Sequence, residues 1–117
     1  MIDEVAAGKL RAKVVRGAAN NQLATTEDGD RLAERDILYA PDYVVNAGGI
    51  INVAAKYLGW PQADSNARVE ATADRLADVF THRKTHGVAP QTAADQLARQ
   101  RIAKASLDAP DELAVAA

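Results

Sequence analysis

The order of elements in this chain is set by residues 12–41, which read AKVVRGAANNQLATTEDGDRLAERDILYAP. Two short apolar runs, residues 12–16 and residues 37–40, stop at Gly17 and at Pro41, and an apolar run beside such a breaker is typical of a strand. Residues 26–35 lie between the runs and have an acidic first turn and a basic end, which predicts a short helix. Strand, helix and strand in this order predict two parallel strands joined by a right-handed crossover.

Two helices are predicted after the second strand. The first covers residues 49–58, where apolar residues recur at helical spacing until Gly59 ends the segment. The second begins at a cap formed by Asp64 or Ser65 and ends near Gly87. The apolar faces expected on these two helices are Ile50, Val53, Ala54 and Tyr57 on the first, and Val69, Ala73, Leu76 and Phe80 on the second.

A third helix and a tail complete the predicted fold. Pro90 opens the helix, which runs from residue 91 to about residue 104, and the tail from residue 106 to residue 117 is expected to fray. The expected apolar line of this helix is Ala94, Leu97, Ala98 and Ile102. The chain is therefore an α/β protein with an incomplete sheet-containing half-domain over residues 1–59 and C-terminal helices over residues 60–105. Because two strands leave an open edge and an open face, either another chain completes the sheet or this is a piece of a larger domain.

Composition excludes several classes of protein. The 117 residues suffice for one domain at most, and 16 acidic against 14 basic residues give a net charge of −2, too little positive charge for a nucleic-acid partner. The absence of cysteine removes disulfides, thiolate zinc sites and cysteine nucleophiles. No signal peptide or membrane-spanning run is visible, so a cytoplasmic location is expected. With one Phe, one Trp and three Tyr the core is thin, and we expect the chain not to be self-sufficient.

Two polar loops follow the predicted strands. The first, residues 17–22, reads Gly-Ala-Ala-Asn-Asn-Gln, and ligands of parallel sheets bind beyond the carboxyl ends of the strands. A polar turn without a ligand is the other interpretation of this composition. The second loop, residues 39–49, places Asn46 as a helix cap before Gly48-Gly49, whose free backbone N–H groups suit an anionic or carbonyl group. Both loops are expected at the same edge of one sheet.

These two segments together resemble the amino-acid dehydrogenases that act on glutamate, leucine, valine and phenylalanine. Residues 13–23 and residues 37–53 are similar to the leucine and valine branch at that family's separation, and the resemblance extends over about residues 2–102. It implies the second half of a Rossmann-like dinucleotide-binding domain followed by C-terminal helices. It also implies reversible NAD-dependent oxidative deamination of an L-amino acid to a 2-oxo acid and ammonium.

The resemblance also assigns site residues. The residues it places along the nicotinamide and its ribose are Ala18, Ala19 and Asn20. Asn46 would lie between the cofactor and the amino-acid substrate, and Ile50 and Val53, one turn apart, would line the pocket for the substrate side chain. Two branched aliphatic residues suit an aliphatic substrate, because an apolar wall leaves a carboxylate side chain unsolvated.

Much of such an enzyme has no counterpart in this sequence. There is no G-x-G-x-x-G fingerprint for the pyrophosphate, and the substrate domain with its catalytic lysines and aspartate is absent. Lys13 and Lys56 do not correspond to those lysines, so no catalytic residue is expected and the chain alone should be inactive. The alternative is a non-catalytic structural or self-associating remnant that completes a sheet from another chain. A free-standing nucleotide-binding module fits less well.

A metal site is not expected. His82 and His86 are four residues apart, as metal-binding histidines on a helix can be, but no third ligand or glutamate accompanies them.

Overall fold

Two parallel strands form the sheet of this chain, of which the computed structural model describes residues 1–108. Strand β1 (Val14–Val15) pairs with β2 (Leu38–Tyr39), with Val14 opposite Leu38. The N–H of Leu38 donates to the carbonyl of Lys13 at 2.9 Å, and that of Ala40 donates to Val15 at 2.9 Å. The predicted parallel pair is confirmed. Each strand is only two residues long, because pairing ends where the chain turns away at Gly17 and Pro41.

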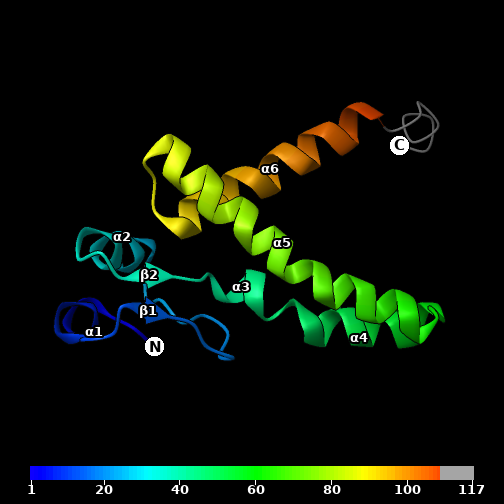
Figure 1. Cartoon of the computed structure of the whole chain (residues 1–117), viewed down its shortest axis with the longest axis horizontal. Coiled ribbons are helices and arrows are strands. Elements are labelled where there is room, and N and C mark those ends of the chain that lie inside the picture. Colours follow the sequence, from blue (N-terminus) through cyan, green and yellow to red (C-terminus); the bar gives the residue numbers. More distant parts are fainter. Residues whose placement is uncertain (109–117) are drawn as a thin grey trace, which may run out of the picture.

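Two helices flank this sheet at the N-terminal end of the molecule (Figure 1). Helix α2 (Thr26–Glu34) was predicted, and a capping box between Thr25 and Asp28 starts it. Helix α1 (Glu4–Lys9) was not predicted; Asp3 caps it by accepting the N–H of Ala6 at 2.8 Å. The two helices pack on each other and on the sheet around one small core. That core consists of Ala7, Leu32, Ile37 and Tyr39, with Ile2, Leu10, Val15 and Leu23 packed against it.

Two helices then follow in immediate succession. Helix α3 (Asp42–Val45) occupies residues expected to form a loop, and after Asn46 the chain enters α4 (Ala47–Leu58), which begins two residues earlier than predicted. Gly59 ends α4 with a φ of 68°, a left-handed conformation that glycine adopts without strain. The predicted end of this helix is confirmed.

The C-terminal half is a pair of long helices, α5 (Gln62–His86) and α6 (Pro90–Asp108). The predicted cap at Asp64 or Ser65 is wrong: α5 starts directly after Pro61, whose carbonyl accepts the N–H groups of both residues, so they lie in its first turn. The predicted end before Gly87 is confirmed. Helix α6 continues through residue 108, past the predicted end near residue 104. The rest of the tail expected to fray, residues 109–117, lies outside the described residues.

Helix α5 contacts different partners along its length, α4 with its first part and α6 with its last (Figure 1). The single apolar face predicted for it is therefore only partly correct. Val69 and Ala73 are exposed, whereas Ser65 and Val79 are buried. Ile102, predicted to continue the apolar line of α6, is 67% exposed. The second core joins α5, α6 and α3 and consists of Val79, Ala93 and Ala94, with Val44, Phe80, Val88 and Leu97 against them.

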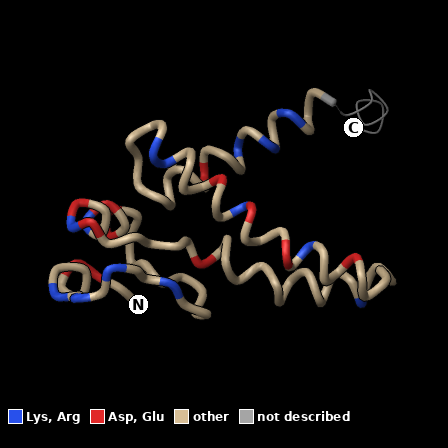
Figure 2. Tube along the Cα trace, viewed as in Figure 1, with Lys and Arg blue, Asp and Glu red and all other residues tan. Residues whose placement is uncertain are grey.

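The molecule is elongated, with principal extents of 52 × 31 × 25 Å. Figure 2 shows acidic and basic residues in both halves, with a stretch of basic residues and no acidic ones over residues 9–16. Within residues 1–108, no helix is both long and apolar enough to cross a membrane.

Candidate functional site

The loop after β1 and the segment after β2 meet at the carboxyl edge of the sheet. The side-chain Nδ2 of Asn46 donates a hydrogen bond to the backbone carbonyl of Ala19 at 3.3 Å, although the residues are 27 positions apart. The prediction that both loops open on one edge is thus confirmed. The prediction that Asn46 is the N-cap residue of α4 is confirmed for its position, but its side chain makes no capping bond to the helix. Helix α3 brings Asn46 to the start of α4 with a φ of −96° and a ψ of 11°, outside the extended conformation of an N-cap.

A second contact joins the same two segments. Asp42, the first residue of α3, accepts the backbone N–H of Gln22 on its Oδ2 at 2.6 Å, and this carboxylate residue is only 7% exposed. Gln22 directly follows Asn21, whose φ of 53° places it in the left-handed region and turns the loop back toward the sheet. The four-residue helix α3 therefore contacts the first loop near both of its ends, through Asp42 at its start and Asn46 after its last residue.

Tyr43 attaches α3 to the C-terminal helices. Its hydroxyl lies 2.9 Å from Oδ1 of Asp95 and 3.0 Å from the carbonyl of Gln91, both on α6. Burial of the hydroxyl and, second, the neighbouring Asp95 carboxylate raise the pKa of Tyr43 above its usual value. Burial also raises the pKa of Tyr39 and is the largest influence on it. Both tyrosines are therefore neutral at physiological pH.

A polar cavity of about 290 Å³ lies between the first loop, α3 and the start of α6. Its lining residues are Asn21, Leu23, Ala24, Thr25, Thr26, Tyr39, Asp42, Tyr43, Gln91 and Asp95. The residues that the sequence assigned to the cofactor do not line it. Ala18, Ala19 and Asn20 are exposed, and the small side chains of the two alanines leave the backbone accessible.

The two residues predicted to contact the substrate lie on one exposed face of α4. Ile50 is 72% exposed and Val53 is 68% exposed, so neither contributes to a core of this chain. Ile50 borders a hollow of about 320 Å³ between α4 and α5, together with Trp60 and Arg68. The placement of this pair agrees with the predicted spacing, and their contact with a substrate stays a prediction.

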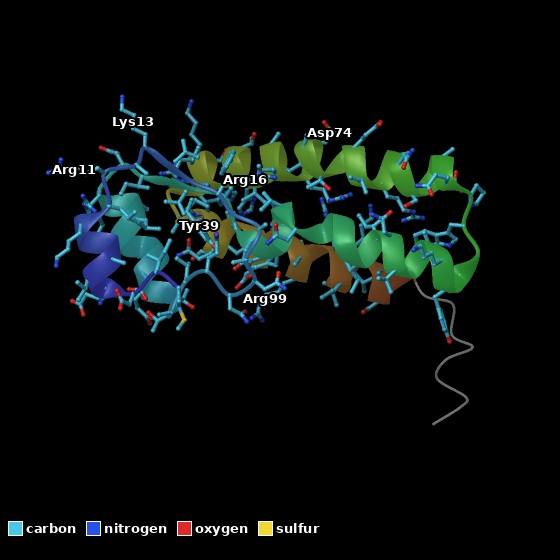
Figure 3. All side chains as sticks on the ribbon, turned by 90° about the horizontal axis from the view of Figure 1, so that it is seen from below. Arg11, Lys13, Arg16, Tyr39, Asp74 and Arg99 are labelled. Atoms are coloured by element: carbon cyan, nitrogen blue, oxygen red, sulfur yellow. The ribbon has the colours of Figure 1, made fainter. Side chains whose placement is uncertain are left out.

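The sequence did not indicate a role for Asp42 or Tyr43, which lie within the predicted loop of residues 39–49. The signal was present, because an acidic residue directly after Pro41 is a helix-start pattern. Lys13 is not expected to be a catalytic group, and in Figure 3 its side chain points away from the body of the molecule. His82 and His86 stack with their ring centroids 3.9 Å apart, and no group of three potential metal ligands occurs among the described residues.

Two parallel strands with a crossover helix and polar loops at their carboxyl ends place the chain in the class of α/β proteins with a partial Rossmann-like fold. The model of the family described as glutamate/leucine/phenylalanine/valine dehydrogenase matches residues 1–109. The chain belongs to this family.

Individual relatives agree with the family. A leucine dehydrogenase of Bacillus cereus is 48% identical over 95 residues, which are 81% of this chain and 26% of the relative. A valine dehydrogenase of Streptomyces coelicolor is 49% identical over 96 residues, which are 82% of this chain and 26% of the relative. The crystal structure of L-tryptophan dehydrogenase from Nostoc punctiforme superimposes with a TM-score of 0.84 at 37% identity, covering 89% of this chain and 31% of that chain. The chain therefore spans about a quarter of the length of these curated relatives.

Proposed function

We propose that this chain is the C-terminal part of an NAD-dependent dehydrogenase of branched-chain L-amino acids. The complete enzyme would oxidise the amino acid to a 2-oxo acid and ammonium, reversibly. Residues 1–59 would supply the nicotinamide side of the cofactor site and residues 60–105 the helices that return toward the missing domain. The observation that carries the proposal is the hydrogen bond from Asn46 to Ala19, because it joins the two loops to which the family resemblance assigns the cofactor.

The exposed residues are compatible with the nicotinamide end of NAD. Ala18 and Ala19 are small and exposed, so a ring can approach the backbone closely, and Asn20 adds an amide that can donate and accept hydrogen bonds. When bound, NAD supplies the hydride acceptor. The pyrophosphate end has no matching glycine fingerprint in this sequence, so these residues fit only half of the cofactor.

Substrate selection would depend on α4. The exposed aliphatic side chains of Ile50 and Val53 form a surface that favours an aliphatic side chain over a charged one. Asn46, one turn before Ile50, is near enough to act between this surface and the first loop. Leucine and valine are the expected substrates, as the names of the similar relatives suggest.

Activity should require the part of the enzyme that this sequence lacks. We expect no NAD reduction by the isolated chain with L-leucine, L-valine or L-isoleucine, and activity when the upstream part of a leucine dehydrogenase is fused to it. The measurement is the absorbance of NADH formed with each amino acid at alkaline pH. Turnover by the chain alone above a buffer blank would contradict the requirement, and a folded but inactive fusion would contradict the proposed function.

A non-catalytic function is the second candidate, and the free edge of β1 favours it. The sheet has two strands, so β1 has no partner on its other side within the described residues, and Val14 is 57% exposed there. Such an edge can pair with a strand of another chain or of a second copy. Under this candidate the chain self-associates or completes another protein's sheet, and it never acquires activity on fusion. A cytoplasmic location belongs to both candidates and is tested by cell fractionation.

A further inference from the structure

We infer that Asp42 is a positioning residue for the loop of residues 17–21. Its carboxylate holds the N–H of Gln22, and the loop is thereby kept in the conformation in which the carbonyl of Ala19 faces Asn46. The effect on the loop concerns this chain alone. Its consequence for cofactor binding rests on the proposed function.

The contact between Asp42 and Gln22 has the features of a strong hydrogen bond. The donor–acceptor distance is 2.6 Å, the acceptor is a carboxylate, and Asp42 is 7% exposed. Charge-assisted bonds of this kind are shorter and stronger than those between neutral groups, and low exposure limits competition from water. Because the donor is a backbone group, the bond constrains the path of the chain and not only a side chain.

Helix α3, which carries Asp42, is held in place by contacts on two sides. The N–H of Asp42 lies 3.3 Å from the hydroxyl of Tyr39, which is 2% exposed in the first core. The next residue, Tyr43, bonds to Asp95 on α6. Helix α3 is thus held by the sheet on one side and by the C-terminal helices on the other.

The loop, in contrast, has few contacts of its own. Residues 18–21 are exposed, and within residues 1–108 the only hydrogen bond that reaches residues 17–21 from another element is the one from Asn46. The bond from Gln22 to Asp42 closes the loop directly after Asn21, whose φ of 53° lies in the left-handed region. The carbonyl of Gln22 accepts the N–H of Ile2 at 2.5 Å, so the chain after the loop has a second attachment. Loss of the Asp42 bond therefore frees the N–H side of Gln22 and the turn at Asn21, and it weakens the contact of Ala19 with Asn46, while the Ile2 bond keeps residues 22–24 in place.

A simpler role for Asp42 is that of an acidic residue that favours the start of α3 through the helix dipole. The geometry argues against that role, because α3 has four residues and the carboxylate bonds to Gln22 of the other segment. Asp3 provides the matched comparison. Its carboxylate also accepts a backbone N–H, that of Ala6 at 2.8 Å, but within its own helix α1, and among the described residues it makes no hydrogen bond to residues 17–22.

The first experiment compares Asp42→Asn, Asp42→Ala and Asp3→Ala in the full chain by amide hydrogen exchange and by NMR chemical shifts. In Asp42→Ala we expect exchange at the Gln22 amide to accelerate at least tenfold and the resonances of residues 18–21 to shift. Asp42→Asn, which keeps one acceptor oxygen and the shape of the side chain, should give an intermediate change. Asp3→Ala should alter α1 alone. Unchanged exchange at Gln22 in Asp42→Asn, with or without a folded Asp42→Ala variant, would overturn the inference.

The second experiment places the same variants in a Bacillus cereus leucine dehydrogenase whose matching segment is replaced by this chain. We expect Asp42→Asn to raise the KM for NAD about fivefold or more while the KM for L-leucine stays within twofold, and Asp3→Ala to change neither. A chimera that folds but fails to reduce NAD contradicts the proposed function, whereas the exchange result stands. An active chimera in which Asp42→Asn leaves the KM for NAD unchanged contradicts the positioning role.

Discussion

The side-chain amide of Gln91 packs directly against the backbone of Gly29 and leaves no room for a side chain at that position. From this place its Nε2 donates to the carbonyl of Thr26 and lies near Oδ1 of Asp30, both at 3.1 Å. The buried Gln91 thereby joins the first residues of α6 to α2, which are more than 60 positions apart. A side chain at residue 29 would displace this contact between the two halves of the elongated chain.

Gly29→Ala should therefore destabilise the chain. A Cβ at residue 29 would collide with the whole amide of Gln91, so this amide would have to leave its bonds to Thr26 and Asp30. We expect a loss of about 1–3 kcal/mol in the free energy of unfolding, as for other overpacked sites. Gly8→Ala is the control, because nothing lies within 4 Å of a Cβ there and alanine is the better helix former, by about 0.5–1 kcal/mol. Urea denaturation of both variants measures the difference. Equal free energies of unfolding for the two variants would show that the Gln91 side chain moves aside at little cost.

Tyr43 should contribute to the pH dependence of stability above about pH 10. Its pKa is raised on folding, so the folded state retains the proton more firmly than the unfolded state, whose tyrosine titrates near 10. The contribution is complete below that unfolded pKa and is lost as the pH rises toward the folded one. We expect Tyr43→Phe to show a smaller decline in stability between about pH 9 and pH 11 than the unsubstituted chain. Tyr57, 89% exposed, provides the control substitution Tyr57→Phe, which should leave the decline unchanged.

The same Tyr43→Phe variant should lose stability at neutral pH by about 0.5–1.5 kcal/mol, the usual net value of a hydrogen bond. The lost partner, Asp95, is exposed and can bond to water instead, so the loss should not exceed that range. Thermal unfolding at pH 7 provides the measurement. A much larger loss would indicate that the hydroxyl does more than attach α3 to α6.

Ile50 and Asn46 should affect a fused, active enzyme in different ways. Ile50→Ala removes aliphatic wall from the proposed substrate pocket, and since one methylene is worth about 1–3 kcal/mol there, the preference for leucine over phenylalanine should fall about tenfold or more. Asn46→Ala should lower kcat for every substrate alike, because it removes a polar contact near the reacting carbon. The comparison is the ratio of kcat/KM for the two amino acids. An unchanged ratio in Ile50→Ala together with a changed one in Asn46→Ala would reverse the two assignments.

Val14→Lys should reduce self-association of the isolated chain. Val14 is 57% exposed on β1, which like β2 has no second neighbouring strand among the described residues, and lysine on an edge strand opposes pairing with another strand. Size-exclusion chromatography with light scattering should give larger species for the unsubstituted chain than for the variant. Val69→Lys, a similar change on α5, should have no such effect. A monomeric unsubstituted chain that melts cooperatively would contradict this prediction and the second candidate function.

Short-range patterns were sufficient for most of the elements. The breakers at Gly17 and Pro41 delimit the two strands, and the glycines at residues 59 and 87, both with positive φ, end α4 and α5 where the sequence predicts. Helix α1 escaped prediction because it has six residues and contains Gly8, so it has no readable period. Helix α3 was not predicted, although Pro41 and Asp42 form a helix-start pattern, because four residues show no helical period. Bonds from Asp42 and Tyr43 to residues 20 and 52 positions away hold it in the fold.

The order strand, helix, strand was enough to predict that the loops at residues 17–22 and 39–49 lie at one edge, because strands joined by a crossover helix run parallel and end on the same side. The contacts that hold the two loops together could be seen only in the folded chain. Asn46 could have capped α4, but α3 places it against Ala19, and Asp42 bonds to Gln22 and not to its own helix. A polar side chain forms hydrogen bonds with groups that folding brings within about 3 Å, and local sequence patterns do not reveal which distant groups these are.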